Sequence, residues 1–173
     1  ERDYWRDLNV NNGPSIKAPG LWAKPSNSGL SVRRDAPELD EHGAEIRAAL
    51  KEPLTSKNYP EIVGPEALPF EGIQVADFAW VGVGPISSKY LADHGADVIR
   101  IESEKRPDVL RIGGPHKDGQ PGLNRSQFFG DFNTSKKSLG LDLKNPEAIE
   151  IARELISKSD VMIESFAPGA IKR

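Results

Sequence analysis

Residues 73–102 follow the pattern of a strand, a glycine-rich turn, a helix and a second strand. The first apolar run, residues 73–81, leads into residues 82–85 (GVGP), and a proline suits the first turn of a helix because that position needs no amide proton. Gly95 ends the helix, and residues 97–102 (DVIRIE) form the second strand. A unit of about thirty residues has the size of a right-handed βαβ crossover, which joins two parallel strands.

A second unit of the same kind follows a long polar loop. Residues 139–143 are predicted to form a strand, Asn145 to cap a helix, and residues 160–165 (DVMIES) to form a further strand. The inward face of the first helix is predicted to hold Ile86, Tyr90 and Leu91. Two βαβ units predict an α/β fold with an open, parallel, doubly wound, Rossmann-like sheet and helices on both faces.

The amino-terminal part of the chain has a different composition. Eight of the 14 prolines precede Phe70, and residues 15–34 are predicted to be extended and rich in loops. Residues 40–50 (DEHGAEIRAAL) are predicted to form one short helix. These features divide the chain into residues 1–51, a linker at 52–69, and an α/β unit at 70–173.

Composition excludes several classes of protein. The chain has no cysteine, so disulfide scaffolds and thiolate metal sites are excluded, and its net charge of −3 offers no general field for nucleic acid or an anionic membrane. His42, His94 and His116 are far apart in sequence, so no metal centre is predicted and all three are interpreted as ordinary surface or loop residues. No apolar run is long enough to span a bilayer and the amino end does not resemble a secretory signal, which predicts a cytoplasmic location.

The predicted sheet directs attention to its carboxyl edge. Ligands of open α/β sheets bind beyond the carboxyl ends of the strands, which here selects residues 80–84, 102–106 and 165–169. Trp80 and Phe166 are interpreted either as pocket walls or as core residues. Basic residues around these stretches are either phosphate ligands or solvated surface charges. They are Arg111, Lys136, Lys137, Lys144, Lys172 and Arg173.

A dinucleotide fingerprint is only partly present in the turn. Gly82 and Gly84 have the required spacing, and Glu102 lies where a ribose-binding acid would stand, but Ser87 replaces the third glycine. The small residues are equally well explained by a tight turn between strand and helix, so a dehydrogenase is the weakest of the functions considered.

The order of these segments resembles the amino-terminal half of the class III CoA-transferases. The resemblance covers residues 68–173 and includes GP at residues 84–85, the strand-end Glu102, LDLK at residues 141–144 and FxPG at residues 166–169. Residues 36–50 (APELDEHGAEIRAAL) resemble the carboxyl-terminal tail of the same family, with Asp40 in place of an expected glycine. A segment that resembles the family's carboxyl-terminal end here precedes one that resembles its amino-terminal half. This order implies the junction of a tandem fusion of two copies, and a permuted single copy is the alternative.

The resemblance implies a domain that holds coenzyme A at the strand ends, in an interlocked homodimer. The residues that it implies for contact with CoA are Trp80, Val81, Gly82, Leu141, Lys144, Ser165, Phe166 and Arg173. Two positions depart from the family pattern, because Ser103 replaces an arginine and Ser165 an asparagine, and Lys105 and Arg106 lie near enough to substitute for the arginine.

The resemblance also implies a reaction. In the family, an aspartate attacks an acyl-CoA thioester to give a mixed anhydride, and CoA passes to an acceptor carboxylic acid. That aspartate lies beyond the FxPG segment in the family, so no catalytic residue is assigned here and the isolated chain is expected to be inactive. No permanently bound cofactor is expected, since CoA is a substrate. A 2-methylacyl-CoA racemase on the same scaffold and a non-catalytic nucleotide-binding or assembly module remain as alternatives.

Overall fold

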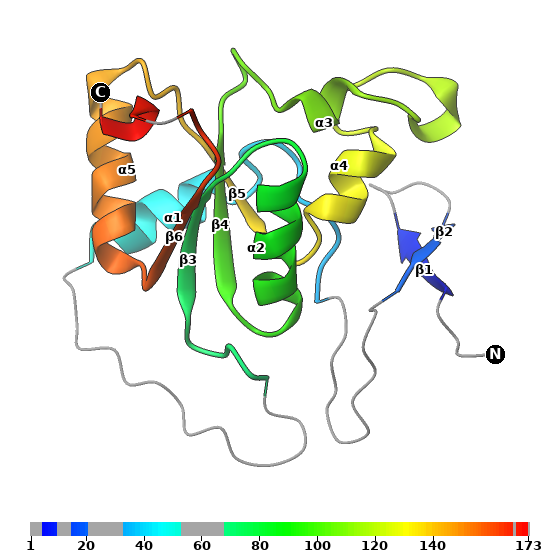
Figure 1. Cartoon of the computed structure of the whole chain (residues 1–173), viewed down its shortest axis with the longest axis horizontal. Helices are drawn as coiled ribbons and strands as arrows, with labels where there is room; N and C mark the ends of the chain where they lie inside the picture. The colour runs from blue at the N-terminus through cyan, green and yellow to red at the C-terminus, as the bar shows by residue number, and fades with distance from the viewer. Residues whose placement is uncertain (1–4, 10–14, 21–32, 53–67, 168, 173) are drawn as a thin grey trace.

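The computed structural model describes residues 5–9, 15–20, 33–52, 68–167 and 169–172, and the elements discussed below lie in these ranges (Figure 1). Residues 53–67, which make up most of the predicted linker, and Arg173 lie outside them. Within the described part of the chain, no helix has both the length and the apolar character needed to cross a membrane.

A four-stranded parallel sheet forms the centre of the molecule. Its strands are β3 (Gln74–Phe78), β4 (Asp97–Glu102), β5 (Lys137–Gly140) and β6 (Val161–Glu164), in the order β5-β4-β3-β6. All three neighbouring pairs are parallel. Taken in chain order this is 3-2-1-4, the order of a Rossmann-like half sheet, and its direction of growth reverses between β3 and β6. The predicted fold class is confirmed.

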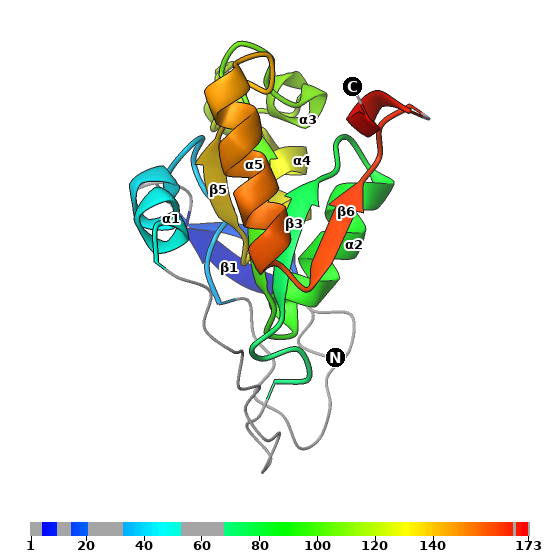
Figure 2. The same ribbon diagram turned by 90° about the vertical axis from the view of Figure 1, so that its left-hand side faces the viewer.

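Helices cover both faces of this sheet. Helix α2 (Val83–Asp93) joins β3 to β4 on one face, whereas α5 (Pro146–Lys158), which joins β5 to β6, lies with α1 (Gly43–Leu50) on the other (Figure 2). The side chain of Asn145 accepts a hydrogen bond from the Glu147 amide and caps α5, as predicted. The larger core lies under α1 and α5 and a smaller one lies under α2.

Some boundaries and faces differ from the prediction. Strand β3 ends at Phe78, so Val81 belongs to the turn, and β5 ends at Gly140, so most of residues 139–143 follow the strand. Leu91 packs against the smaller core as predicted, but Tyr90 is 40% exposed, and the fully buried residues of α2 include Ser88 and Ala92. The difference at Tyr90 arises because α2 also packs through small side chains, which hydrophobicity alone does not select.

Several short elements were not predicted. An antiparallel hairpin forms within the amino-terminal stretch, and the polar loop between β4 and β5 contains helical turns. They are β1 (Trp5–Asn9), β2 (Ser15–Pro19), α3 (Val109–Ile112), a 3-10 turn at Lys117–Gly119 and α4 (Gln127–Phe132). A further 3-10 turn, Ala170–Lys172, closes the described part of the chain.

Residues 33–52, here called the tail segment, dock against the edge strand β5. Asp40 Oδ1 accepts a hydrogen bond from the Gly140 amide at 2.6 Å, and Arg47 Nη2 donates to the Gly140 carbonyl at 2.8 Å. The His42 amide donates to the Ser138 carbonyl at 3.1 Å, and His42 Nδ1 accepts from the Ser138 amide at 3.3 Å. His42 is therefore a structural contact rather than an ordinary loop residue. Four backbone groups on the outer side of β5 are paired without a fifth strand.

Candidate functional site

The turn between β3 and α2, residues 79–82, contains a non-glycine residue with a positive φ. Val81 has a φ of +68° and is half exposed. A β-branched residue in this left-handed region is an outlier that costs on the order of 1–3 kcal/mol, and such residues cluster at functional sites because the surrounding structure must hold them. The turn stands beside β6, at the point where the strand order reverses.

Hydrogen bonds from three other segments fix this turn. Arg100 Nη1 donates to the Ala79 carbonyl at 2.9 Å, and Asp108 Oδ2 accepts from the Val81 amide at 3.1 Å. On the side of β6, Ser165 Oγ accepts from the Trp80 amide at 2.8 Å and donates to the Trp80 carbonyl at 3.2 Å. Side chains from β4, from the loop that follows it and from the end of β6 therefore hold the turn in its conformation.

Helix α2 begins immediately after the turn. Its N-cap is Gly82, whose position provides no capping side chain. Because the first amides of a helix have no partner within the helix and carry a partial positive charge, this end of α2 is suited to an anion. Gly84 allows the helix to approach the strand, since a Cβ at that position would lie 2.3 Å from the Ala79 Cβ.

The two glycines of the turn are expected to respond differently to an added methyl group. Gly84→Ala forces α2 away from Ala79, and overpacking of this kind lowers the free energy of unfolding by about 1–3 kcal/mol. Gly82→Ala is the matched control, because an added Cβ meets no heavy atom within 4 Å and its φ is −96°. Urea denaturation measures both; equal midpoints for the two variants would contradict the close approach.

Charged side chains are buried on the face of the sheet that α2 covers. Along β3 and β4 the residues facing α2 change from Val75 and Val98 to charged groups toward the carboxyl ends. The charged groups that are at most 1% exposed at this end are Asp77, Arg100, Glu102, Asp108, Arg111 and Lys136. Buried charges are tolerated only when they are paired, and here they form one connected network.

Arg100 and Arg111 carry the positive charge of one half of this network. Arg100 Nη2 pairs with Asp108 Oδ2, and Arg100 Nε lies 3.5 Å from Glu102 Oε2. Arg111 Nε donates to Glu102 Oε1 at 2.7 Å, and its guanidinium lies 3.5 Å from the centre of the Phe129 ring. Glu102 is thus committed to two arginines, which removes the basis for interpreting it as a ribose-binding acid.

Lys136 is the cation of the other half. Its Nζ donates to Asp77 Oδ2 at 3.0 Å, to the Pro85 carbonyl at 3.0 Å and to Asn133 Oδ1 at 2.8 Å. Ser88 also donates to Asp77 Oδ2, at 2.6 Å. Burial lowers the pKa of Lys136 to about 8, because removal of water from the ammonium outweighs the attraction of Asp77.

These positions correct the interpretation of two basic residues. Arg111 and Lys136 are not solvated surface charges, because each side chain is fully buried and paired with a carboxylate. Lys105 is exposed and paired with Asp142 at 2.8 Å, whereas the Arg106 guanidinium lies 5.6 Å from the centre of the Trp80 ring.

The residues expected to contact CoA fall into two groups along the carboxyl edge. Trp80 and Ser165 are hydrogen-bonded at the ends of β3 and β6, in one group with Val81 and Gly82, and the neighbouring Phe166 packs partly against the larger core. The other group follows β5, where the Leu141 side chain is buried in that core and Lys144 is exposed.

A small cavity of about 290 Å³ lies at the carboxyl ends of β4 and β5. Leu141, Lys105 and Asp142 contribute to its lining. Neither Trp80, Lys144 nor Phe166 lines it, and the larger cavity described next does not include them either. Among the described residues, therefore, neither of these two cavities joins the two groups.

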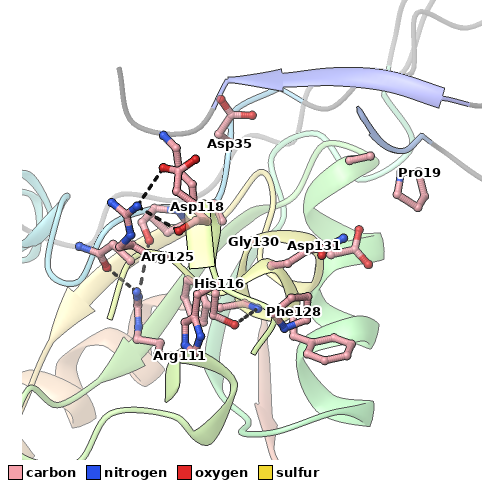
Figure 3. Close-up of a pocket in the computed structure, with 18 of the residues that line it drawn as sticks. Pro19, Asp35, Arg111, His116, Asp118, Arg125, Phe128, Gly130 and Asp131 are labelled. Atoms are coloured by element: carbon pink, nitrogen blue, oxygen red, sulfur yellow. Dashed lines mark hydrogen bonds and ion pairs between the residues drawn. The ribbon is translucent and has the colours of Figure 1, made fainter. Parts of the chain in front are cut away.

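A larger cavity of about 520 Å³ lies between the tail segment, β2 and the loop that carries α3 and α4 (Figure 3). The Asp118–Arg125 ion pair lies at one side of it, and Phe128 and Asp131 of α4 lie at the other. Arg111 forms part of its wall, so this cavity adjoins the buried network. Sequence reasoning missed it because its lining comes from unpredicted elements. Among the described residues, no group of three or more histidine, aspartate or glutamate side chains is arranged to hold a metal ion.

The fold and the turn together define a class of protein. A parallel sheet in the order 3-2-1-4, with a fixed turn and an uncapped helix end at the point where the order reverses, is a doubly wound α/β domain. The sequence profile of CoA-transferase family III matches residues 70–173, which include every strand of the parallel sheet. The chain belongs to CoA-transferase family III.

Individual relatives agree with this assignment. The formyl-CoA:oxalate CoA-transferase of Bradyrhizobium sp. (strain ORS 278) is 41% identical over 103 residues, which are 60% of this chain and 23% of that protein. The succinyl-CoA:glutarate CoA-transferase of Homo sapiens is 33% identical over 103 residues, again 60% of this chain and 23% of that protein. This chain therefore spans about a quarter of the length of the curated relatives it matches.

Solved structures resemble the same part of the chain. A CAIB/BAIF family protein from Brucella suis aligns with a TM-score of 0.54 at 32% identity, covering 61% of this chain and 28% of that one. A hypothetical protein from Mycobacterium tuberculosis aligns with a TM-score of 0.52 at 30% identity, over 61% of this chain and 28% of that one.

Proposed function

We propose that this chain supplies the CoA-binding part of a transferase that moves CoA between an acyl-CoA and a carboxylic acid. The match of the family profile to residues 70–173, a range that contains the whole parallel sheet and the β3–α2 turn, carries this proposal. The substrates are then an acyl-CoA and an acceptor acid, and the relatives are named for acids of this kind, oxalate and glutarate.

In the proposed arrangement, the phosphates of CoA bind at the free amino end of α2 and beside Lys144. Gly82 presents backbone rather than a side chain to the ligand, and Lys144 is exposed directly before α5. Charge-assisted hydrogen bonds to phosphate contribute about 1.5–3 kcal/mol each. Trp80, Val81, Leu141, Ser165, Phe166 and Arg173 complete the proposed contacts; Arg173 lies outside the described residues.

The chemical step is assigned to an aspartate outside this chain. Its carboxylate attacks the thioester carbonyl carbon, the C–S bond breaks, and CoA leaves as a thiolate while a mixed anhydride remains. The thiolate then attacks the aspartyl carbonyl carbon of the anhydride and releases the donor acid as its carboxylate. The acceptor carboxylate displaces the thiolate from the resulting aspartyl thioester, and the thiolate attacks the acceptor's carbonyl in this second anhydride, which forms the new acyl-CoA and frees the aspartate. This chain holds the CoA portion and supplies no nucleophile, so on its own it is inactive. We propose in addition that the full-length protein is a cytoplasmic, interlocked homodimer. This chain then spans the junction of a tandem fusion.

Thermal melting of the full 173-residue chain with CoA tests the binding step. CoA at about one hundred times its dissociation constant adds about 2.7 kcal/mol of stability and raises the melting midpoint, whereas NAD leaves it unchanged. Lys144→Ala is expected to reduce the shift produced by CoA. Lys17→Ala is the matched control, because Lys17 is an exposed lysine on the hairpin that pairs with Asp7. An equal shift with NAD, or no shift with CoA, argues against the proposal.

A further inference from the structure

The Asp108 carboxylate contacts the β3–α2 turn from a fully buried position. Its Oδ2 accepts from the Val81 amide at 3.1 Å and also pairs with Arg100, while its Oδ1 accepts from the Leu110 amide at 2.9 Å and caps α3. The backbone of Asp108 is fixed as well, because its amide donates to Glu102 Oε1 at 2.9 Å. The carboxylate has no freedom to follow the turn if the turn moves.

Arg100 holds the opposite side of the same turn. Its Nη1 donates to the Ala79 carbonyl at 2.9 Å, two residues before the amide that Asp108 holds. Arg100 is surrounded by the carboxylates of Asp77, Glu102 and Asp108, at N–O separations of at most 3.9 Å, so its guanidinium is fixed in turn. The ion pair of Arg100 and Asp108 therefore brackets the turn at both of its ends.

The turn needs the hydrogen bonds from Arg100 and Asp108 because it contains Val81. Val81 is β-branched and adopts a φ of +68°, a conformation that glycine takes freely and valine avoids. Without an acceptor for its amide, Val81 gains by returning to negative φ. That rotation turns the amide away and changes the backbone that leads into Gly82 and the amino end of α2.

We propose that Asp108 is a positioning residue for CoA, acting through the Val81 amide. The inference rests on the proposed function, since it assumes that this turn receives the ligand. Asp108 itself does not touch CoA; it keeps the turn in the one conformation that leaves the first amides of α2 directed at the ligand. Part of the CoA affinity is then set by a loop residue that lies 27 positions after the turn in sequence.

Calorimetric titration of the full chain with CoA, below its melting temperature, tests this inference. Asp108→Asn is expected to weaken CoA binding about tenfold or more, which corresponds to the cost of the released conformation. Adding Val81→Gly to that variant is expected to restore most of the affinity, because glycine adopts positive φ without the carboxylate. A merely structural role of Asp108 predicts no rescue, so a double variant as weak as Asp108→Asn would overturn the proposal.

Asp93→Asn serves as the matched control. Asp93 is equally buried and paired, with Lys89 and Ser135, but it lies at the far end of α2. This variant is expected to melt earlier than the wild type while its CoA affinity stays within about twofold. Wild-type chain that binds no CoA refutes the proposed function, whereas normal CoA binding by Asp108→Asn refutes only the positioning role.

Val81→Pro provides a test in which every charged side chain of the buried network is kept and only the hydrogen bond from the Val81 amide to Asp108 is lost. Proline fixes φ near −65° and has no amide proton, so the turn cannot take its present form, and Val81 is exposed enough for the fold to tolerate the change. We expect this variant to lose CoA binding even if Asp108→Asn does not fold. CoA affinity equal to that of the wild type would overturn the inference.

Discussion

Replacing Lys136 by methionine is expected to lower the free energy of unfolding by about 3–5 kcal/mol, because it leaves the Asp77 carboxylate buried without its cation. Lys136 is fully buried and bonded to β3, α2 and the segment before β5, so no water replaces it at low cost. Urea denaturation followed by circular dichroism measures the loss. Arg153→Gln is the control: it breaks an ion pair with Glu150 whose partners are 71% and 69% exposed, and costs less than about 1 kcal/mol.

The Lys136→Met substitution is also expected to change how the free energy of unfolding depends on pH. The pKa of Lys136 is lowered to about 8 in the folded chain from its ordinary 10.5, so between these pH values the folded state holds fewer protons at this site than the unfolded state. The free energy of unfolding therefore rises with pH through this group, by about 3 kcal/mol from pH 8 to pH 10.5. The methionine variant lacks that rise. A constant difference between the two proteins from pH 7 to pH 10.5 would contradict the lowered pKa.

Replacing Ile46 by alanine is expected to cost about 2–5 kcal/mol, because its side chain is buried in the larger core beneath α5. The result would show that the tail segment is a structural part of this domain and not an appendage. Ala49→Ser, on the exposed face of the same helix, is expected to change stability by about 0.5 kcal/mol through helix propensity alone. Similar denaturation midpoints for the two variants would mean that the tail segment does not share the core of the sheet.

The parts of the fold that sequence predicts well are those with a single dominant pattern. The start of helix α5 was predicted correctly because Asn145 and Pro146 mark it, and one apolar stripe runs along the helix. The four strands were recognised because they are short apolar runs bounded by turns. Helix α2 was placed correctly and Leu91 faces the core as predicted, but the small residues Ser88 and Ala92 are buried where Tyr90 was expected.

The candidate site was harder to predict because its key groups are charged. Arg100, Glu102 and Asp108 look like surface residues in a sequence, and only tertiary packing brings them into contact. Alternation along β4 provided one usable signal, since Arg100 and Glu102 occupy the same side of the strand as the buried Val98. The positive φ of Val81 could not be predicted, because the sequence has valine at this position and only a glycine would have indicated it.

Side chains of the tail segment block the outer edge of β5, so a further strand can join the sheet only at its other edge. Asp40, His42 and Arg47 already occupy the backbone groups with which an incoming strand would pair, so a new strand cannot be added there without displacing them. At the opposite border, β6 has no neighbour among the described strands on its outer side, and Val161 and Met162 are more than one-third exposed. Any extension of this sheet by another part of a longer protein, or by a second molecule, must therefore begin beside β6.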